Sequence, residues 1–333
     1  MEQAKLISVE NDLIRREPSS EKPVDLSVVI PISERHDDLR EIYRQCVQEI
    51  SANGYSYEFI FVLDGADHEI LQILKDLKKD YPDIKVITLS RRLGEATALA
   101  VGLDKARAPI ILTIPAYFQV EPCDVHRLLK KLVEGEQDLV IAWRYPRIDS
   151  LFNRVQSWVF HRLTGMLTGL KYHDISCGLR AMKRKVAQEV QLYGDLHRFF
   201  PLLANQRGFK VEEVTVRQSR QDLNRRVYGP GVYLRRLLDV LTLFFLYKFT
   251  KKPLRFFGLI GSGVSCAGLV ITGYLGLYRL LGFGGIAGRP ILILGVLLMV
   301  LGVQLFSMGL LGEIIIFTHA RDVKDYQIKE LLE

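Results

Sequence analysis

Up to about residue 222, short runs of hydrophobic residues alternate with segments in which hydrophobic residues recur at helical spacing. Short apolar runs predict strands at residues 25–31, 57–63, 84–90, 110–114 and 138–143. Between these runs, apolar residues recur every three or four positions and predict helices, for example over residues 39–50 and from about 124 to 134. Strands that alternate with helices predict an α/β fold with a mostly parallel sheet covered on both faces.

Local signals sharpen the start of several elements. Asp37 and Asp38 stand where N-caps of the first helix are expected, and Gly94 opens an alanine-rich helix. After Arg144 the pattern changes to one longer amphipathic helix, which we expect over residues 152–170. The stretch "HDISCGLRAMKR" then predicts a polar turn into a short strand or a hairpin, and "GFKVEEVTVRQ" predicts an edge strand.

Two long apolar segments follow near the C-terminus. Phe256–Tyr278 and Ile291–Gly312 carry no charged residue, and each exceeds the roughly 20 residues that a bilayer core requires. Lys and Arg before the first span and after the second favour cytoplasmic termini, with the glycine-rich link outside. Val232–Thr250 is strongly apolar but interrupted by charges, which predicts an interfacial helix.

The charge and the cysteines restrict the function classes. The formal net charge is +7, but the basic residues crowd beside the spans, which indicates anionic lipid headgroups and argues against a nucleic-acid binder. The four cysteines lie far apart without a Cys-x-x-Cys pair, so we expect reduced thiols.

Five stretches occur in an order that resembles a known family. They are "LSVVIPISERHDDL", "FIFVLDGADHE", "LSRRLGEATALAVGLDKA", "DLVIAWRYPR" and "DISCGLRAMKRKV", and two spans ending in "GLLGE" follow them. The chain thus resembles family-2 inverting glycosyltransferases, and among them the polyprenyl-phosphate group of dolichyl-phosphate mannose synthase and GtrB-like enzymes.

This resemblance implies a GT-A nucleotide-binding domain that moves a sugar from a UDP- or GDP-sugar to polyprenyl phosphate. The reaction would take place at the cytoplasmic face of the cell (inner) membrane. The same resemblance implies that the protein can form homo-oligomers. We therefore divide the chain into an N-terminal tail (1–24), a GT-A domain (25–222), a juxtamembrane interfacial region (223–255), a two-helix transmembrane anchor (256–319) and a cytoplasmic tail (320–333).

The resemblance also assigns a donor site. Asp64 matches the aspartate that accepts hydrogen bonds from the base or ribose, and a turn aspartate before Gly65 is the alternative. Gly94 would let a phosphate approach the start of a helix, or would be a plain loop glycine. The donor-binding set by this resemblance is Pro31, Glu34, Asp64, Arg91, Gly94 and Gln119.

The metal motif of the family is absent from this chain. Its Asp-x-Asp pair, which holds Mg²⁺ or Mn²⁺ on the diphosphate, corresponds here to Pro115 and Tyr117, and neither ligates a hard cation. We therefore expect no metal site, and we expect Arg92, with Arg91, to supply the missing positive charge in catalysis. A solvated loop charge is the alternative for Arg92.

The acceptor side needs cations more than it needs a base, because a lipid phosphate is mostly ionised at neutral pH. By resemblance the acceptor phosphate contacts Arg144, Arg154, Ser157 and Arg180. Asp174 would be catalytic by orienting the acceptor or the sugar, with a turn or N-cap role as the alternative. A different class of function stays open as well: an inactive relative that binds lipid phosphate, nucleotide or a partner subunit without turnover.

Overall fold

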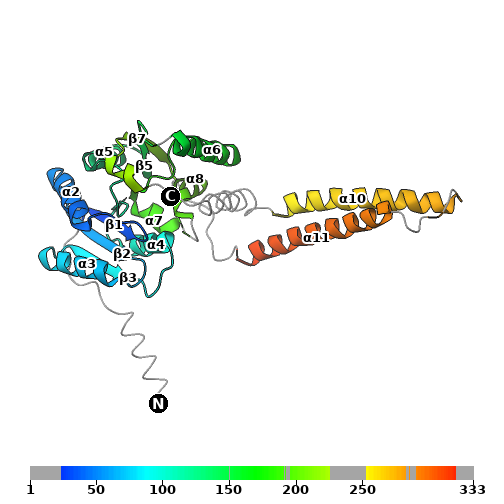
Figure 1. Ribbon diagram of the computed structural model, residues 1–333, viewed down its shortest axis with the longest axis horizontal. Coiled ribbons are helices and arrows are strands. Elements are labelled where there is room, and N and C mark those ends of the chain that lie inside the picture. Colours follow the sequence, from blue (N-terminus) through cyan, green and yellow to red (C-terminus); the bar gives the residue numbers. More distant parts are fainter. Residues whose placement is uncertain are drawn as a thin grey trace, which may run out of the picture. The chain divides into compact units, whose positions relative to one another are not determined.

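The computed structural model describes residues 24–149, 151–190, 192, 196–225, 253–282, 285 and 290–319 (Figure 1). The expected N-terminal tail up to residue 23, the interfacial helix over 232–250 and the C-terminal tail lie outside these residues. The chain forms two compact units, which are described separately. The first comprises residues up to 148, 176–198 and 210–224, and the second comprises 149–175, 199–209 and the residues after 224.

The first unit is built on a seven-stranded sheet with the order β3-β2-β1-β4-β6-β5-β7. The strands are β1 (Leu26–Ile32), β2 (Tyr57–Leu63), β3 (Ile84–Thr88), β4 (Ile110–Thr113), β5 (Leu139–Arg144), β6 (Arg180–Lys183) and β7 (Val211–Val216). Among these strands only β6 runs antiparallel to its neighbours, β4 and β5. The predicted mostly parallel sheet is confirmed, and so is the edge position of the strand at 211–216.

Helices cover both faces of this sheet (Figure 1). The helices of the first unit are α2 (Leu39–Ala52), α3 (His68–Asp80), α4 (Glu95–Lys105), α5 (Val125–Glu134) and α7 (Arg184–Glu189). Alternate strand residues such as Val28 and Phe61 join the buried cluster formed by α2, α3 and α5. Gly102 of α4 faces Val29 so closely that a Cβ there would collide with the valine side chain. The glycine therefore sets how near α4 lies to the sheet.

The two predicted N-caps of α2 have different roles. The Asp38 carboxylate accepts hydrogen bonds from the N–H groups of Arg40 and Glu41, so the cap prediction is confirmed for Asp38. The Asp37 carboxylate instead accepts from Phe118 N at 2.9 Å, and Asp37 N donates to Ala116 O at 2.8 Å. The prediction was wrong for Asp37, which fixes the loop after β4.

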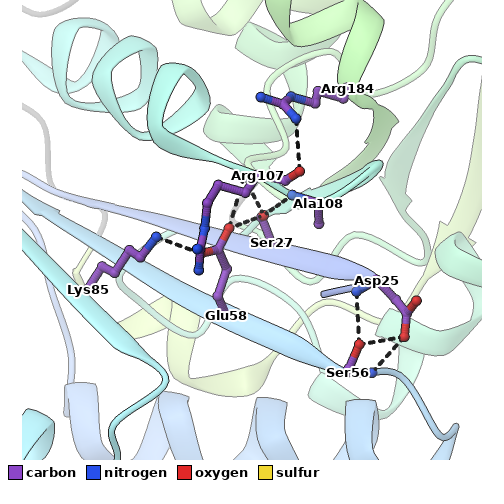
Figure 2. A network of polar contacts seen from close by, with 8 residues as sticks. All are labelled: Asp25, Ser27, Ser56, Glu58, Lys85, Arg107, Ala108 and Arg184. Atoms are coloured by element: carbon purple, nitrogen blue, oxygen red, sulfur yellow. Dashed lines mark hydrogen bonds and ion pairs between the residues drawn. The ribbon is translucent and has the colours of Figure 1, made fainter. Parts of the chain in front are cut away.

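A buried carboxylate ties the amino ends of the central strands together (Figure 2). Glu58 of β2 is 2% exposed and accepts from Ser27 Oγ at 2.6 Å and from Arg107 N at 2.9 Å. The guanidinium of Arg107 and the ammonium of Lys85 lie 3.0 Å from Glu58 Oε2. Both carboxylate oxygens of Glu58 thus have partners, so the network stabilises the sheet at the amino ends of its parallel strands.

The second unit contains α6 (Leu151–Thr168), α8 (Phe200–Gln206), α10 (Pro253–Leu280) and α11 (Pro290–His319). Helix α6 agrees with the predicted amphipathic helix to within two residues at each end. Helices α10 and α11 contain the predicted spans and extend them, and both are long and apolar enough to cross a membrane.

Glycines set the close packing of α10 against α11, which run antiparallel (Figure 1). A Cβ at Gly261 would lie 2.6 Å from Gly302 O, and one at Gly268 would lie 2.5 Å from Gly295 O. Only glycine permits this approach of the two backbones, as is typical of helix pairs in membranes. At one end of the pair, Glu313 Oε2 accepts a hydrogen bond from Leu254 N at 3.4 Å, so α11 caps the start of α10.

Candidate active site

One edge of the sheet collects the loops that carry most of the predicted site residues. The carboxyl ends of β1, β2, β4, β5 and β7 meet there, together with the amino end of the antiparallel β6. In open α/β sheets this is the edge at which ligands bind. The candidate site is built from these loops.

Asp64 and Gly94 lie in contact at this edge, and their contact with a donor remains a prediction. Asp64 follows β2, and its carboxylate accepts from Leu93 N at 2.6 Å and from Gly94 N at 2.9 Å. Gly94 has a φ of +95°, which a residue with a side chain adopts only with strain, and it opens α4. The N–H groups assigned to a phosphate therefore already hold a carboxylate, so a phosphate at this helix start would have to displace Asp64.

The other predicted donor residues differ widely in exposure. Arg91 and Arg92 are exposed, and neither has a hydrogen-bond or ion-pair partner in the part of the chain that the structure describes. The stem of Arg92 passes over Gly65, where an added Cβ would lie 2.7 Å from Arg92 Cγ. Pro31 is buried within β1 beside Val62, whereas Glu34 is exposed just beyond the strand.

Gln119 joins two loops of the site. Its side chain is 3% exposed, and Oε1 accepts from Gly178 N at 2.8 Å and from Cys177 Sγ at 3.3 Å. Its Nε2 group lies 3.3 Å from the Tyr117 hydroxyl. These contacts fix the loop after β4 against the loop before β6, and a contact of Gln119 with the donor remains a prediction.

Two arginines share one buried carboxylate beside Tyr117. Arg35 Nη2 lies 3.2 Å from Asp222 Oδ1, and Arg144 Nη1 lies 3.6 Å from Asp222 Oδ2. The Arg35 guanidinium also stacks on the Tyr117 ring, with Cζ 3.8 Å from the ring centroid. We call Arg35, Tyr117, Arg144 and Asp222 the guanidinium cluster. Sequence reasoning had marked Tyr117 and Arg144 but had missed Arg35 and Asp222.

The donor set at this position does not fit a divalent metal ion. Burial raises the pKa of the Tyr117 phenol well above its usual range, and the Glu95 carboxylate raises it further, although Arg144 and Arg35 act in the opposite direction. Tyr117 is therefore a neutral phenol, the Pro115 side chain offers no ligand atom, and Asp222 is fully buried between two guanidiniums. Within the described ranges there is also no group of three or more His, Cys, Asp or Glu side chains that could hold a metal ion.

A histidine that sequence reasoning missed lies beside the start of α4. His197 is 8% exposed, and its Nε2 is 3.6 Å from Glu95 Oε2. Burial lowers the pKa of His197 to about 3, and the charges of Arg198 and Arg180 add to this effect, so the imidazole is neutral at neutral pH. No motif pointed to this residue, because its surroundings come from segments that are distant in sequence.

Arg180 is buried and holds backbone groups rather than facing solvent. It is 3% exposed, and it donates to Cys177 O at 3.0 Å and to His197 O at 2.8 Å. Arg144 is 2% exposed and also donates to Ser176 Oγ at 3.2 Å. Both side chains thus position the loops of this edge, and their predicted contact with an acceptor phosphate remains a prediction.

The remaining predicted acceptor residues belong to the second unit. His161 of α6 accepts from Ile175 N at 3.2 Å through Nε2, so Nδ1 carries the proton and donates to Ser157 O at 2.6 Å. This histidine ties α6 to the loop that carries Asp174, which is 1% exposed. The backbone of Arg154 belongs to α6, but its side chain lies outside the description. The roles of Arg154, Ser157 and Asp174 remain predictions.

A hollow of about 530 Å³ lies near the guanidinium cluster, although none of the four cluster residues lines it. Phe118, Ile148 and Gln218 line it, and Gln218 Nε2 donates to Asp222 Oδ2 at 2.9 Å. Its size falls within the range of ligand pockets.

Comparison with known proteins shows which proteins the chain is similar to. The family model "Glycosyl transferase family 2" matches residues 27–191. The chain is 29% identical to dodecaprenyl-phosphate galacturonate synthase of Rhizobium johnstonii over 303 residues, covering 90% of each protein. It is 30% identical to undecaprenyl-phosphate 4-deoxy-4-formamido-L-arabinose transferase of Pseudomonas aeruginosa over 294 residues, covering 87% of this chain and 85% of the relative.

Among solved structures, the chain is similar to glucosyl-3-phosphoglycerate synthase from Mycobacterium tuberculosis in complex with Mn²⁺, UDP and phosphoglyceric acid. The identity is 16% and the TM-score is 0.49, with 66% of this chain and 78% of that chain covered.

Proposed function

The chain belongs to glycosyl transferase family 2 and is a glycosyltransferase, and we propose that it transfers a sugar from a UDP- or GDP-sugar to polyprenyl phosphate. The single observation that carries this proposal is similarity over 87% to 90% of the chain to two relatives whose names specify a polyprenyl-phosphate product or acceptor. Its two helices that are long and apolar enough to cross a membrane support a membrane protein. We place the reaction at the cytoplasmic face of the membrane.

The chemistry is an in-line displacement at the anomeric carbon of the sugar. An oxygen of the lipid phosphate forms the new bond, and the bond to the β-phosphate breaks, with its electron pair leaving on the nucleoside diphosphate. The attacking phosphate is already ionised, so the site mainly has to hold two phosphates in line and neutralise the departing one. In this proposal Asp64 contacts the donor nucleotide, Asp174 orients the reactants, and Arg144, Arg154, Ser157 and Arg180 form the acceptor side.

We further propose that turnover does not require a divalent metal ion. The chemistry of Pro115, Tyr117 and Asp222 supports this, because these residues offer no accessible carboxylate at the position of the family's metal motif. Arg91 and Arg92, exposed on the loop before α4, remain proposed sources of positive charge.

The test uses membranes that contain the full-length protein, polyprenyl phosphate and labelled UDP- or GDP-sugars. We expect one nucleotide sugar to yield a chloroform-soluble product, and we expect EDTA to leave the rate nearly unchanged. Arg92→Ala should lower the rate by roughly 10- to 100-fold if its guanidinium contacts a phosphate. Lys75→Ala, which removes an exposed charge from α3, is the matched control.

Two outcomes would contradict parts of this proposal. Nucleotide binding without product across all donors would favour an inactive relative that only binds its ligands. Product formation with unchanged Arg92→Ala activity would keep the transferase function and remove Arg92 from the catalytic residues.

A further inference from the structure

The position of the missing metal ligand is already covered by a positive charge. Tyr117 occupies the second position of the Asp-x-Asp motif by resemblance, and the Arg35 guanidinium lies flat on its ring at 3.8 Å. An aromatic face attracts a cation, and arginine stacks on tyrosine especially well. One substitution thus removes a metal ligand and at the same time provides a platform for a guanidinium.

We propose that Arg35 binds the diphosphate of the nucleotide sugar in place of the divalent cation. This inference rests on the proposed glycosyltransferase function, because it names the group that neutralises the leaving nucleoside diphosphate. Arg35 lies just beyond β1 and Tyr117 lies just beyond β4, so both belong to the ligand-binding edge of the sheet.

The guanidinium of Arg35 is held in place and still has a donor to offer. The Asp222 carboxylate binds its Nη2 from one direction, and the Tyr117 ring covers one of its faces. Its Nε is buried and has no hydrogen-bond partner among the described residues. A buried N–H without an acceptor is costly, and a phosphate oxygen would satisfy it.

Exposure separates Arg35 from the other members of the guanidinium cluster. The side chain of Arg35 keeps 21% of its surface accessible, whereas Arg144 keeps 2% and Asp222 none. Among the charged members of this cluster, Arg35 is therefore the one that a ligand can reach. Arg144 and Asp222 act as positioning residues that hold it from behind.

The charge of the cluster also suits an anion. Asp222 is shared by two guanidiniums, so these three side chains carry one net positive charge. The Glu95 carboxylate at the start of α4 raises the pKa of the Tyr117 phenol and lies 3.6 Å from the neutral His197. A Mg²⁺ ion beside Asp222 would be repelled by both arginines, whereas a diphosphate is attracted to them and accepts two parallel hydrogen bonds from a guanidinium.

The test measures binding of UDP and GDP to the full-length protein by calorimetry, in EDTA and in Mg²⁺. We expect the wild type to bind one of the two nucleotides equally well in both buffers. Arg35→Ala should weaken this binding by roughly 10- to 100-fold, which is the usual effect of losing a charged hydrogen bond. Arg40→Ala, which removes an exposed arginine five positions further along, should bind as the wild type does.

Three further variants protect the test against misfolding and separate the roles of the charge, the Tyr117 ring and its hydroxyl group. Arg35→Lys keeps the charge but loses the stacked, forked geometry, so we expect a weakening smaller than that of Arg35→Ala. Tyr117→Phe keeps the platform, so binding should change less than threefold. The double variant Arg35→Ala/Tyr117→Asp should recover affinity only when Mg²⁺ is present.

The inference is overturned if EDTA abolishes wild-type binding, if Arg35→Ala binds as tightly as the wild type, or if the wild type binds neither nucleotide. Its failure can be distinguished from failure of the proposed function. If lipid-linked product forms and depends on Mg²⁺ but not on Arg35, the proposed function stands and the role of Arg35 is refuted. If nucleotide binding depends on Arg35 but no lipid-linked product forms, the role of Arg35 stands and the proposed function is refuted.

Discussion

His197 shows how burial alone changes the chemistry of one side chain. Its pKa falls to about 3, mainly through burial and further through Arg198 and Arg180. Between pH 6.5 and 3 the unfolded chain binds a proton that the folded imidazole does not bind. The free energy of unfolding therefore falls as the pH drops below about 6.5, by at most ~1.4 kcal/mol per pH unit.

The measurement for this prediction is thermal unfolding of the wild type and of His197→Gln between pH 7 and pH 5. The wild type should lose more stability over this interval than the variant, because glutamine cannot bind the proton. Glu95 is present in both proteins, so its own titration enters both curves. Parallel curves would show that His197 does not contribute to the acid sensitivity.

The predicted site residues that lie together in the fold are those placed by local signals. Asp64 lies directly after a strand and Gly94 directly before a helix, so their meeting follows from the α/β pattern. The ion pair of Arg35 with Asp222 joins residues 187 positions apart, and no periodicity reports such a contact. The sequence showed that the carboxylates were missing at positions 115 and 117, but only the fold shows which arginine lies there.

At the scale of elements, the strongly periodic segments and the short strand of the "HDISCGLRAMKR" stretch agreed with the structure, whereas the direction of that strand and two short helices were not predicted. The strand at Tyr57–Leu63 and the two apolar spans follow directly from composition. β6 has only four residues, "RAMK", and its antiparallel direction arises from pairing with β4 and β5. Helices α7 and α8, of six and seven residues, were missed because so short a helix hardly shows its period.

The packing of α10 against α11 leads to a prediction about two neighbouring glycines. Gly261→Ala would place a methyl group 2.6 Å from backbone atoms of α11, so the two helices must separate. We expect a loss of about 1–3 kcal/mol in the stability of the helix pair, as for other overpacked interiors. Gly263→Ala is the matched control, because nothing lies within 4 Å of its Cβ position.

This pair of variants can be compared by thermal unfolding in detergent and by crosslinking between cysteines placed on the two helices. Gly263→Ala should be neutral or slightly stabilising, since alanine favours the helix more than glycine does. Equal melting temperatures for both alanine variants would show that close backbone contact does not stabilise the pair.

At the scale of the whole molecule, the orientation of α10 and α11 in a membrane would determine which substrates the protein can reach. Because α10 and α11 run antiparallel, Pro253 and Glu313 lie at the same end of the pair, where Leu254 N donates to Glu313. If the pair spans the membrane, the segments before Pro253 and after His319 emerge on one side. The glycosyltransferase domain precedes Pro253. If it uses cytoplasmic nucleotide sugars as proposed, this side must be the cytoplasm.

The basic residues make this a testable expectation about topology. Arg255 precedes the first uncharged span and Arg321 and Lys324 follow the second, while Arg279 and Arg289 in the link reduce the asymmetry. Alkaline phosphatase, which is active only outside the cytoplasm, should therefore be active when inserted after Gly285 and inactive when fused after Glu333. The opposite pattern would place the sheet's ligand-binding edge on the far side of the membrane, where a cytoplasmic donor cannot reach it, and the proposed reaction would fail for lack of substrate even with an intact site.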